Sequence, residues 1–289
     1  MILDTMTQEE LLREIKSDYS EVVGRWRNFQ AKFRKTVQKR ASYPWLWETY
    51  VKTRRHNEWY ISYYAETKKE SDIVNAMITL TFKYKGQLWT GTVMDDVTLI
   101  FAEHFFERYK ERFMKIHKDS KILSDKDIMK MFFILNSNLC FLGNEKEDNI
   151  RGYCYDGIFY GDWIGKEGGM VKTFLSRQEM KINQFTEYFE VFKMWIIQDM
   201  FKARKGMNLN SSLIKYIPDT YFEYNEWNRF LFERGNLRLI RAAEECNEIY
   251  IKNTEQYRRC REMIDAVNQN MYEKKNSKDK SDESALTKQ

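Results

Sequence analysis

The hydrophobic period changes along the chain, and this change limits the folds that the sequence can adopt. Between residues 57 and 101, β-branched and aromatic residues alternate with polar ones in four stretches, which predicts strands. Residues 8–41 and 177–205 instead carry apolar residues every three or four positions, which is typical of amphipathic helices. Strand patterns return over residues 150–176. This order argues against a doubly wound parallel sheet, and we expect an α+β fold with a central antiparallel sheet and flanking helices.

Composition divides the 289 residues into four regions. Only 12 Gly and 2 Pro are present, so long flexible linkers are not expected. We expect basic amphipathic helices over residues 1–56 and an α+β domain over residues 57–185. A C-terminal helical extension should follow over residues 186–272. Residues 273–289 have almost nothing to bury, so we expect a disordered tail there.

Two short motifs predict local structure inside the central region. Lys85 and Gly86 separate two strand-like stretches, which predicts the tight turn of an antiparallel hairpin. Ser124, with Asp127 three positions later, precedes the apolar run IMKMFFIL and resembles a helix capping box. The central region should therefore contain at least one hairpin and one capped helix.

Several classes of protein lack support in the sequence. The cysteines are widely spaced and form no C-x-x-C pair, so neither a metal site nor a disulfide framework is expected, and a reduced cytoplasmic interior fits them. They are Cys140, Cys154, Cys246 and Cys260. No nucleotide or cofactor motif occurs, so we expect no cofactor. No run of about 18 apolar residues exists and the N-terminus is acidic and amphipathic, so neither a membrane span nor a secretory signal is expected.

A basic segment lies in the second half of the first predicted helix. Residues 25–40 carry seven basic side chains and no acid, although the whole chain has a net charge of only +5. The segment can be a solvated helix face whose charge is balanced by acids elsewhere in the fold. It can also contact phosphates, which would make RNA the partner. In that interpretation the nucleic-acid-binding residues of the segment are Arg25, Arg27, Lys32, Arg34 and Lys35.

A second polar pattern follows the strand-like stretch VTLIF. His104, Arg108 and Arg112 recur at four-residue spacing, so on a helix they form one stripe with steps of roughly 6 Å. Guanidinium groups match phosphate oxygens, and an imidazole transfers protons near neutral pH. The stripe therefore indicates phosphate chemistry. Alternatively, Glu107 and Glu111 lie close enough in sequence to tie the stripe into a surface lattice of ion pairs.

The order of these elements resembles a known superfamily over roughly residues 95–185. The His-x3-Arg-x3-Arg helix, a second helix, and Gly-punctuated strands ending in Lys-Thr-Phe-Leu-Ser are similar to the barnase-like, colicin-like and RelE-like toxin ribonucleases. The resemblance implies metal-independent RNA cleavage by attack of a 2′-hydroxyl on phosphate. It implies that His104 transfers protons, that Arg108 and Arg112 hold the phosphate, and that Thr173 donates a hydrogen bond. Lys172 would add a phosphate contact.

Two other functions agree with the same sequence. The chain can be a non-catalytic module of a phage or mobile element that binds nucleic acid or protein, which requires only the basic helix and the many aromatic residues. It can also be an assembly protein that self-associates through the helices at residues 8–41 and 177–205. We therefore expect RNA as the partner of a nuclease, and RNA, another protein or a second copy as the partner of a binding protein.

Overall fold

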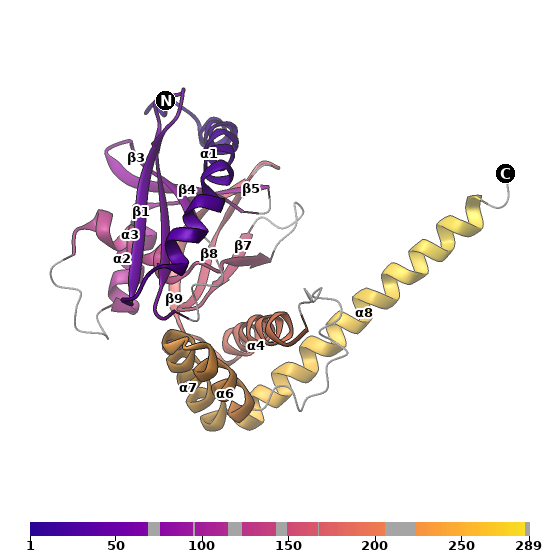
Figure 1. Cartoon of the computed structure of the whole chain (residues 1–289). Coiled ribbons are helices and arrows are strands. Elements are labelled where there is room, and N and C mark those ends of the chain that lie inside the picture. The colour runs from indigo at the N-terminus through magenta and orange to yellow at the C-terminus, as the bar shows by residue number, and fades with distance from the viewer. Residues whose placement is uncertain are drawn as a thin grey trace.

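Nine strands form one sheet at the centre of the protein (Figure 1). The structure, a computed structural model, describes residues 1–68, 76–94, 96–114, 123–142, 149–166, 168–205 and 224–286. In spatial order the strands run β1-β2-β3-β4-β5-β9-β8-β7-β6. Their bounds are β1 Trp45–Lys52, β2 Glu58–Ala65, β3 Met77–Tyr84, β4 Gln87–Met94, β5 Val97–Phe101, β6 Cys140–Leu142, β7 Asn149–Cys154, β8 Gly157–Ile164 and β9 Gly168–Ser176. The helices are α1 Gln8–Gln38, α2 Glu103–Arg112, α3 Asp125–Leu135, the short 3-10 helix η3 Arg177–Glu179, α4 Ile182–Lys205, α6 Tyr224–Arg234, α7 Leu237–Lys252 and α8 Thr254–Leu286.

The strands form two antiparallel groups that meet at one parallel pair. Each strand from β1 to β5 pairs antiparallel with the next, and so does each strand from β6 to β9. β5 and β9 run parallel, with Thr98 opposite Gly168 and Phe101 opposite Val171. The chain between them contains α2, α3 and three strands, which supplies the long crossover that parallel strands require. The predicted α+β fold is confirmed, with one parallel pair inside an otherwise antiparallel sheet.

α1 covers the first group of strands on one face of the sheet. A capping box starts the helix, because the Thr7 hydroxyl accepts from the Glu10 amide and the Glu10 carboxylate accepts from the Thr7 amide. In the second half of the helix, the rings of Trp26 and Phe33 lie 5.8 and 4.5 Å from the ring of Trp47 on β1. The aromatic residues around the end of α1 therefore build a core between the helix and the sheet.

α2 and α3 cover the opposite face of the sheet. Their contacts with β5, β8 and β9 consist largely of phenylalanine rings. The ring of Phe105 on α2 lies 4.9 Å from that of Phe132 on α3 and 5.1 Å from that of Phe101 on β5. These rings are buried, and each aromatic pair adds about 0.5–1.5 kcal/mol beyond the burial of its area. The apolar side of α2 is thus held firmly on the sheet.

The C-terminal helices pack on the same face of the sheet as α1. Ile158 of β8 packs with α4, α6, α7 and the first part of α8, whereas Ile164 of the same strand packs against the α1 core. Both residues have even numbers, so their side chains leave the strand on the same face. α1 and α4 therefore lie on one face, above different parts of the sheet.

Two regions differ from the sequence-based prediction. Residues 1–56 were expected to hold basic amphipathic helices and no strand, but β1 occupies Trp45–Lys52 and pairs with all of β2. Trp45, Trp47, Thr49 and Val51 alternate on the α1 side of this strand, a period that its high aromatic content conceals. Residues 273–286 were expected to be disordered, but α8 continues to Leu286. A helix extends easily once its first turns are formed, and Glu and Lys are good helix formers.

The two local motifs of the central region are present. Lys85 and Gly86 have φ values of 50° and 79°, and Tyr84 pairs with Gln87, so a two-residue turn joins β3 to β4 as predicted. Ser124 caps α3, because its hydroxyl oxygen accepts from the Asp127 amide at 3.3 Å.

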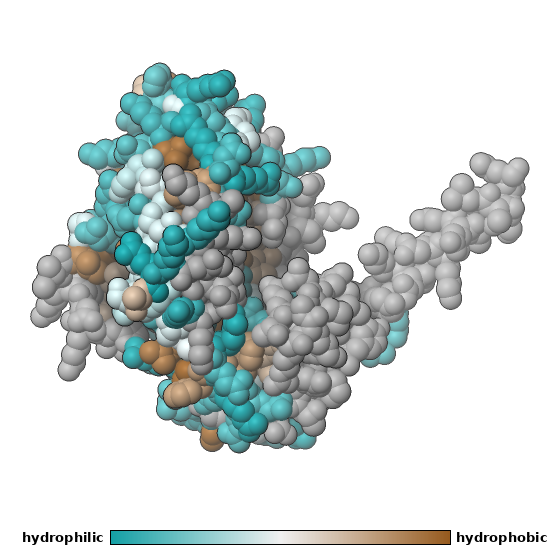
Figure 2. Space-filling view, viewed as in Figure 1, coloured by the Kyte–Doolittle hydropathy of each residue, from teal (hydrophilic) through white to brown (hydrophobic). Residues whose placement is uncertain are grey.

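Hydrophilic residues cover most of the coloured surface in the view of Figure 2. Within the described ranges, no helix combines the length and the apolar composition needed to cross a bilayer.

Candidate functional site

α2 presents the predicted His-x3-Arg-x3-Arg stripe to solvent. His104 is exposed, and its Nδ1 lies 3.1 Å from Oε2 of Glu107. Arg108 donates from Nε to Nε2 of His104 at 3.4 Å and from Nη1 to Oε2 of Glu111 at 2.8 Å. The surface lattice of ion pairs, which the sequence left open as an alternative, is the arrangement found for these residues.

Arg112 at the end of the stripe supports the backbone of a neighbouring strand. Its Nη1 donates to the carbonyl oxygen of Phe174 at 2.5 Å, and its Nε lies 3.6 Å from Oε1 of Glu179. The carbonyl and the carboxylate together occupy donors that a bound phosphate would need.

The predicted catalytic group does not come together, because Thr173 and Lys172 lie across the sheet from α2. The ring of Phe174 faces α2, at 6.1 Å from the ring of Phe105 and 5.1 Å from that of Tyr109. Successive side chains of a strand point to opposite faces, so Thr173 points to the face of α1 and α4. The sheet separates its hydroxyl from the stripe, which corrects the convergence that the resemblance implied.

Thr173 and Lys172 instead line a cavity on the sheet, which we call the sheet-face cavity. It has a volume of about 610 Å³. Tyr160 in its wall accepts a hydrogen bond from Nε2 of Gln184 on α4 at 3.0 Å, and Met170, further along β9, receives a contact from Gln8 of α1. The cavity therefore lies between the two helices. Its lining residues are Asn149, Ile150, Arg151, Tyr160, Gly161, Asp162, Lys172 and Thr173.

A β-bulge in β9 directs Lys172, one of the two cations, toward this cavity. Tyr160 pairs with Thr173 but Gly161 pairs with Val171, so Lys172 is the extra residue on β9. A bulge bends a strand and changes the direction of the side chain it carries. It allows Lys172 and Thr173 to line the same cavity although they are adjacent in sequence.

Both cations of the cavity form ion pairs. Lys172 pairs with Asp162, and Arg151 pairs with Glu187 of α4. Both basic side chains are 47% exposed. Exposed pairs of this kind contribute only about 0.2–1 kcal/mol, so an incoming anion can replace the carboxylates. The lining contains two cations and one carboxylate, and Glu187 beside Arg151 adds a second carboxylate, so the charges around the cavity balance.

The basic segment of α1 is used partly for structure. Arg25 pairs with Glu21 and donates from Nη1 to the carbonyl oxygen of Lys52 at 2.9 Å, which ties α1 to the end of β1. Arg27 and Lys35 are exposed. The side chains of Lys32 and Arg34 lie outside the described part of the structure.

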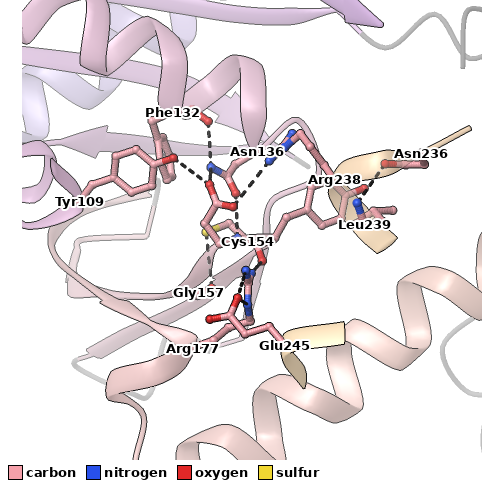
Figure 3. Close-up of polar contacts among 12 residues, drawn as sticks. Tyr109, Phe132, Asn136, Cys154, Gly157, Arg177, Asn236, Arg238, Leu239 and Glu245 are labelled. Carbon is pink, nitrogen blue, oxygen red and sulfur yellow. Dashed lines mark hydrogen bonds and ion pairs between the residues drawn. The ribbon is translucent and has the colours of Figure 1, made fainter. Parts of the chain in front are cut away.

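A buried polar network joins the α2–α3 layer to the C-terminal helices (Figure 3). Asp156, in the β7–β8 turn, is 5% exposed. Its Oδ2 accepts from the hydroxyl of Tyr109 and from Nδ2 of Asn136, both at 2.8 Å, and its Oδ1 lies 3.6 Å from Nη2 of Arg238 on α7. Burial, with the Asp156 charge adding to it, raises the pKa of Tyr109 well above its ordinary value, so the phenol stays protonated and donates.

Arg177 continues the network toward the C-terminal helices. The side chain is 6% exposed and donates to Oε2 of Glu245 on α7 from Nε at 2.8 Å and from Nη2 at 2.5 Å. It also donates to the carbonyl oxygen of Tyr155, which accepts from the Tyr188 hydroxyl at 2.7 Å as well. Each of these side chains forms a hydrogen bond or an ion pair with another protein group, so the network has a structural role.

Neither a metal site nor an activated thiol stands out. Among the described residues, no three His, Cys, Asp or Glu side chains are arranged to hold a metal ion. Burial raises the pKa of the Cys246 thiol to about 12, and it raises that of Cys154 as well. Both thiols therefore stay protonated and weakly nucleophilic near neutral pH.

These features define a mixed-sheet α+β protein with a polar cavity on one sheet face and a stripe of paired charges on the other. No protein-family model, curated protein or solved structure matches the chain.

Proposed function

We propose that the chain is a non-catalytic RNA-binding protein that holds a single strand across the sheet-face cavity. The observation that carries this proposal is the meeting of Arg151, Tyr160, Lys172 and Thr173, from three adjacent strands, around one cavity. Arg151 and Lys172 supply the charge for a phosphodiester, and the Thr173 hydroxyl supplies a neutral donor. The phenol ring of Tyr160 offers a surface for an unpaired base.

A phosphodiester has to compete with a carboxylate at each cation of the cavity. Arg151 and Lys172 can each bind a phosphate oxygen, and Glu187 and Asp162 compete with the ligand for them. Desolvation by burial raises the pKa of Tyr160, so its ring stays neutral beside the phosphate. Exposed bases are needed for stacking, which favours single strands over duplexes.

The binding experiment uses fluorescence anisotropy of a short fluorescein-labelled oligouridylate. We expect Lys172→Ala and Arg151→Ala each to weaken binding about tenfold and to reduce the slope of log K against log salt by about 1, because each removes one phosphate contact. We expect Asp162→Asn to tighten binding severalfold, because the amide no longer competes for Lys172.

Lys126→Ala is the matched control, since it removes one exposed lysine from α3 on the opposite face of the sheet. It should leave the affinity unchanged. The proposal fails if wild type does not bind the oligonucleotide, or if Lys126→Ala weakens binding as much as Lys172→Ala does.

A cleavage assay separates this proposal from the ribonuclease that the sequence resemblance implies. A nuclease built on the α2 stripe would cut RNA without added metal and would lose that activity in His104→Ala. We expect wild type and His104→Ala to leave the RNA equally intact, because Glu107 and Arg108 engage the imidazole and Thr173 lies across the sheet. Products that appear with wild type alone, seen on a denaturing gel, would restore the nuclease.

A further inference from the structure

β1 is one of the two outer strands of the sheet. In the described part of the chain it pairs with β2 alone, through eight successive residue pairs without a register shift. The other outer strand, β6, has only three residues. Long, regular outer strands expose backbone donors and acceptors, and proteins usually cover or interrupt them.

The hydrogen-bond pattern identifies which residues of β1 turn outward. The Thr53 amide donates to the carbonyl oxygen of Asn57 at 3.0 Å, so this pair is a hydrogen-bonded one. Such pairs alternate along an antiparallel ladder, and the amide and carbonyl groups of the residues between them point away from the neighbouring strand. The outward residues are Leu46, Glu48, Tyr50 and Lys52. The bond from Arg25 to the Lys52 carbonyl agrees with this pattern, because that oxygen faces away from β2.

The four side chains of the outward row are exposed, and Arg25 contacts the carbonyl oxygen of Lys52 at one end of it. Leu46 is 42% and Tyr50 44% exposed, and β1 contains neither a proline nor a bulge. Lys130 of α3 lies beside the row, with its Nζ 3.9 Å from Oε1 of Glu48 and 5.4 Å from the centroid of the Tyr50 ring. The outward row thus combines apolar Leu46, the phenol of Tyr50 and the opposite charges of Glu48 and Lys52.

We propose that β1 pairs antiparallel with β1 of a second copy of this chain, with Tyr50 opposite Tyr50 of that copy. A twofold axis through this pair keeps each side chain on its own face of the joined sheet. It places Glu48 opposite Lys52 of the second copy and Lys52 opposite Glu48 of the second copy. Two opposite-charge pairs then flank one aromatic pair, which is the favourable combination across antiparallel strands.

The charges of Glu48 and Lys52 favour this register over the neighbouring registers. A shift that sets Glu48 opposite Glu48 of the second copy brings like charges together, which opposes pairing. A shift that centres the axis on Thr49 pairs Lys52 with the apolar Leu46. Of these registers, only the Tyr50-centred one sets both Glu48 and Lys52 opposite a residue of the other charge, so the outer surface of β1 is complementary to itself.

Sedimentation velocity over a range of concentrations tests the proposal. We expect wild type to sediment with twice the 35.2 kDa chain mass as concentration rises. Glu48→Lys and Lys52→Glu should each weaken the dimer at least tenfold, because each sets like charges opposite one another. The double variant Glu48→Lys/Lys52→Glu should regain the dimer, because the exchanged charges are complementary again.

Glu244→Lys, the same change on the exposed surface of α7, is the control and should leave the dimer intact. Circular dichroism of each variant checks that it is folded, because Glu48 also accepts from the Tyr60 hydroxyl. A wild type that stays monomeric at all concentrations overturns the proposal. So does a dimer that survives both single reversals, or a folded double variant that remains monomeric.

Discussion

Asp156→Ala is expected to lower the free energy of unfolding by about 3–5 kcal/mol, because it leaves two buried donors and a partly buried cation without their acceptor. Tyr109 and Asn136 lose the carboxylate that receives their hydrogen bonds, and Arg238 loses its opposite charge. Chemical denaturation followed by far-ultraviolet circular dichroism measures this loss.

The same substitution on the surface is its control. Asp265 on α8 is 69% exposed and lies 3.9 Å from Nε of Arg261, so Asp265→Ala should change stability by less than about 0.5 kcal/mol. Equal effects of Asp156→Ala and Asp265→Ala would show that the buried network does not stabilise the fold.

Arg177→Met is expected to cost about 3 kcal/mol, for a related reason. The side chain keeps much of its length but loses the donors to Glu245 and to the Tyr155 carbonyl, so a partly buried carboxylate is left unpaired. Denaturation midpoints of the single and double variants give the coupling between the two residues.

Arg177→Met/Glu245→Leu should recover part of the loss, because an apolar pair can replace a buried ion pair with little net change. A double variant that is less stable than the sum of the two single losses would contradict this account. Arg258→Met, in an exposed pair with Glu255, is the control and should be nearly neutral.

The sequence was informative where one strong pattern dominated a segment. β2 to β5 and β7 to β9 are rich in β-branched and aromatic residues between polar turns, and this composition predicted them, although many of their residues are buried on both faces. β1 was missed because Trp45 and Trp47 share a segment with many other aromatic residues. The parallel pairing of β5 and β9 could not be predicted, since it depends on where a long crossover returns to the sheet.

The candidate site was less predictable because its residues meet only after folding. Lys172 and Thr173 both line the sheet-face cavity, but the sequence could not reveal on which face of the sheet they lie. The bulge at Lys172 breaks the alternation from which a face is inferred. Arg151 and Asp162 had no local motif to mark them, and Asp156 reaches its partners on α2, α3 and α7 only through tertiary packing.

Photochemical cross-linking tests the central claim, that RNA lies across the sheet-face cavity. The wild-type protein is mixed with oligouridylate, irradiated with ultraviolet light and digested, and the linked peptides are identified by mass spectrometry. We expect the uracil adduct on Tyr160, and we expect Lys172→Ala to reduce its yield along with the affinity. Adducts confined to α1 or α2, with Tyr160 unmodified, would contradict the account.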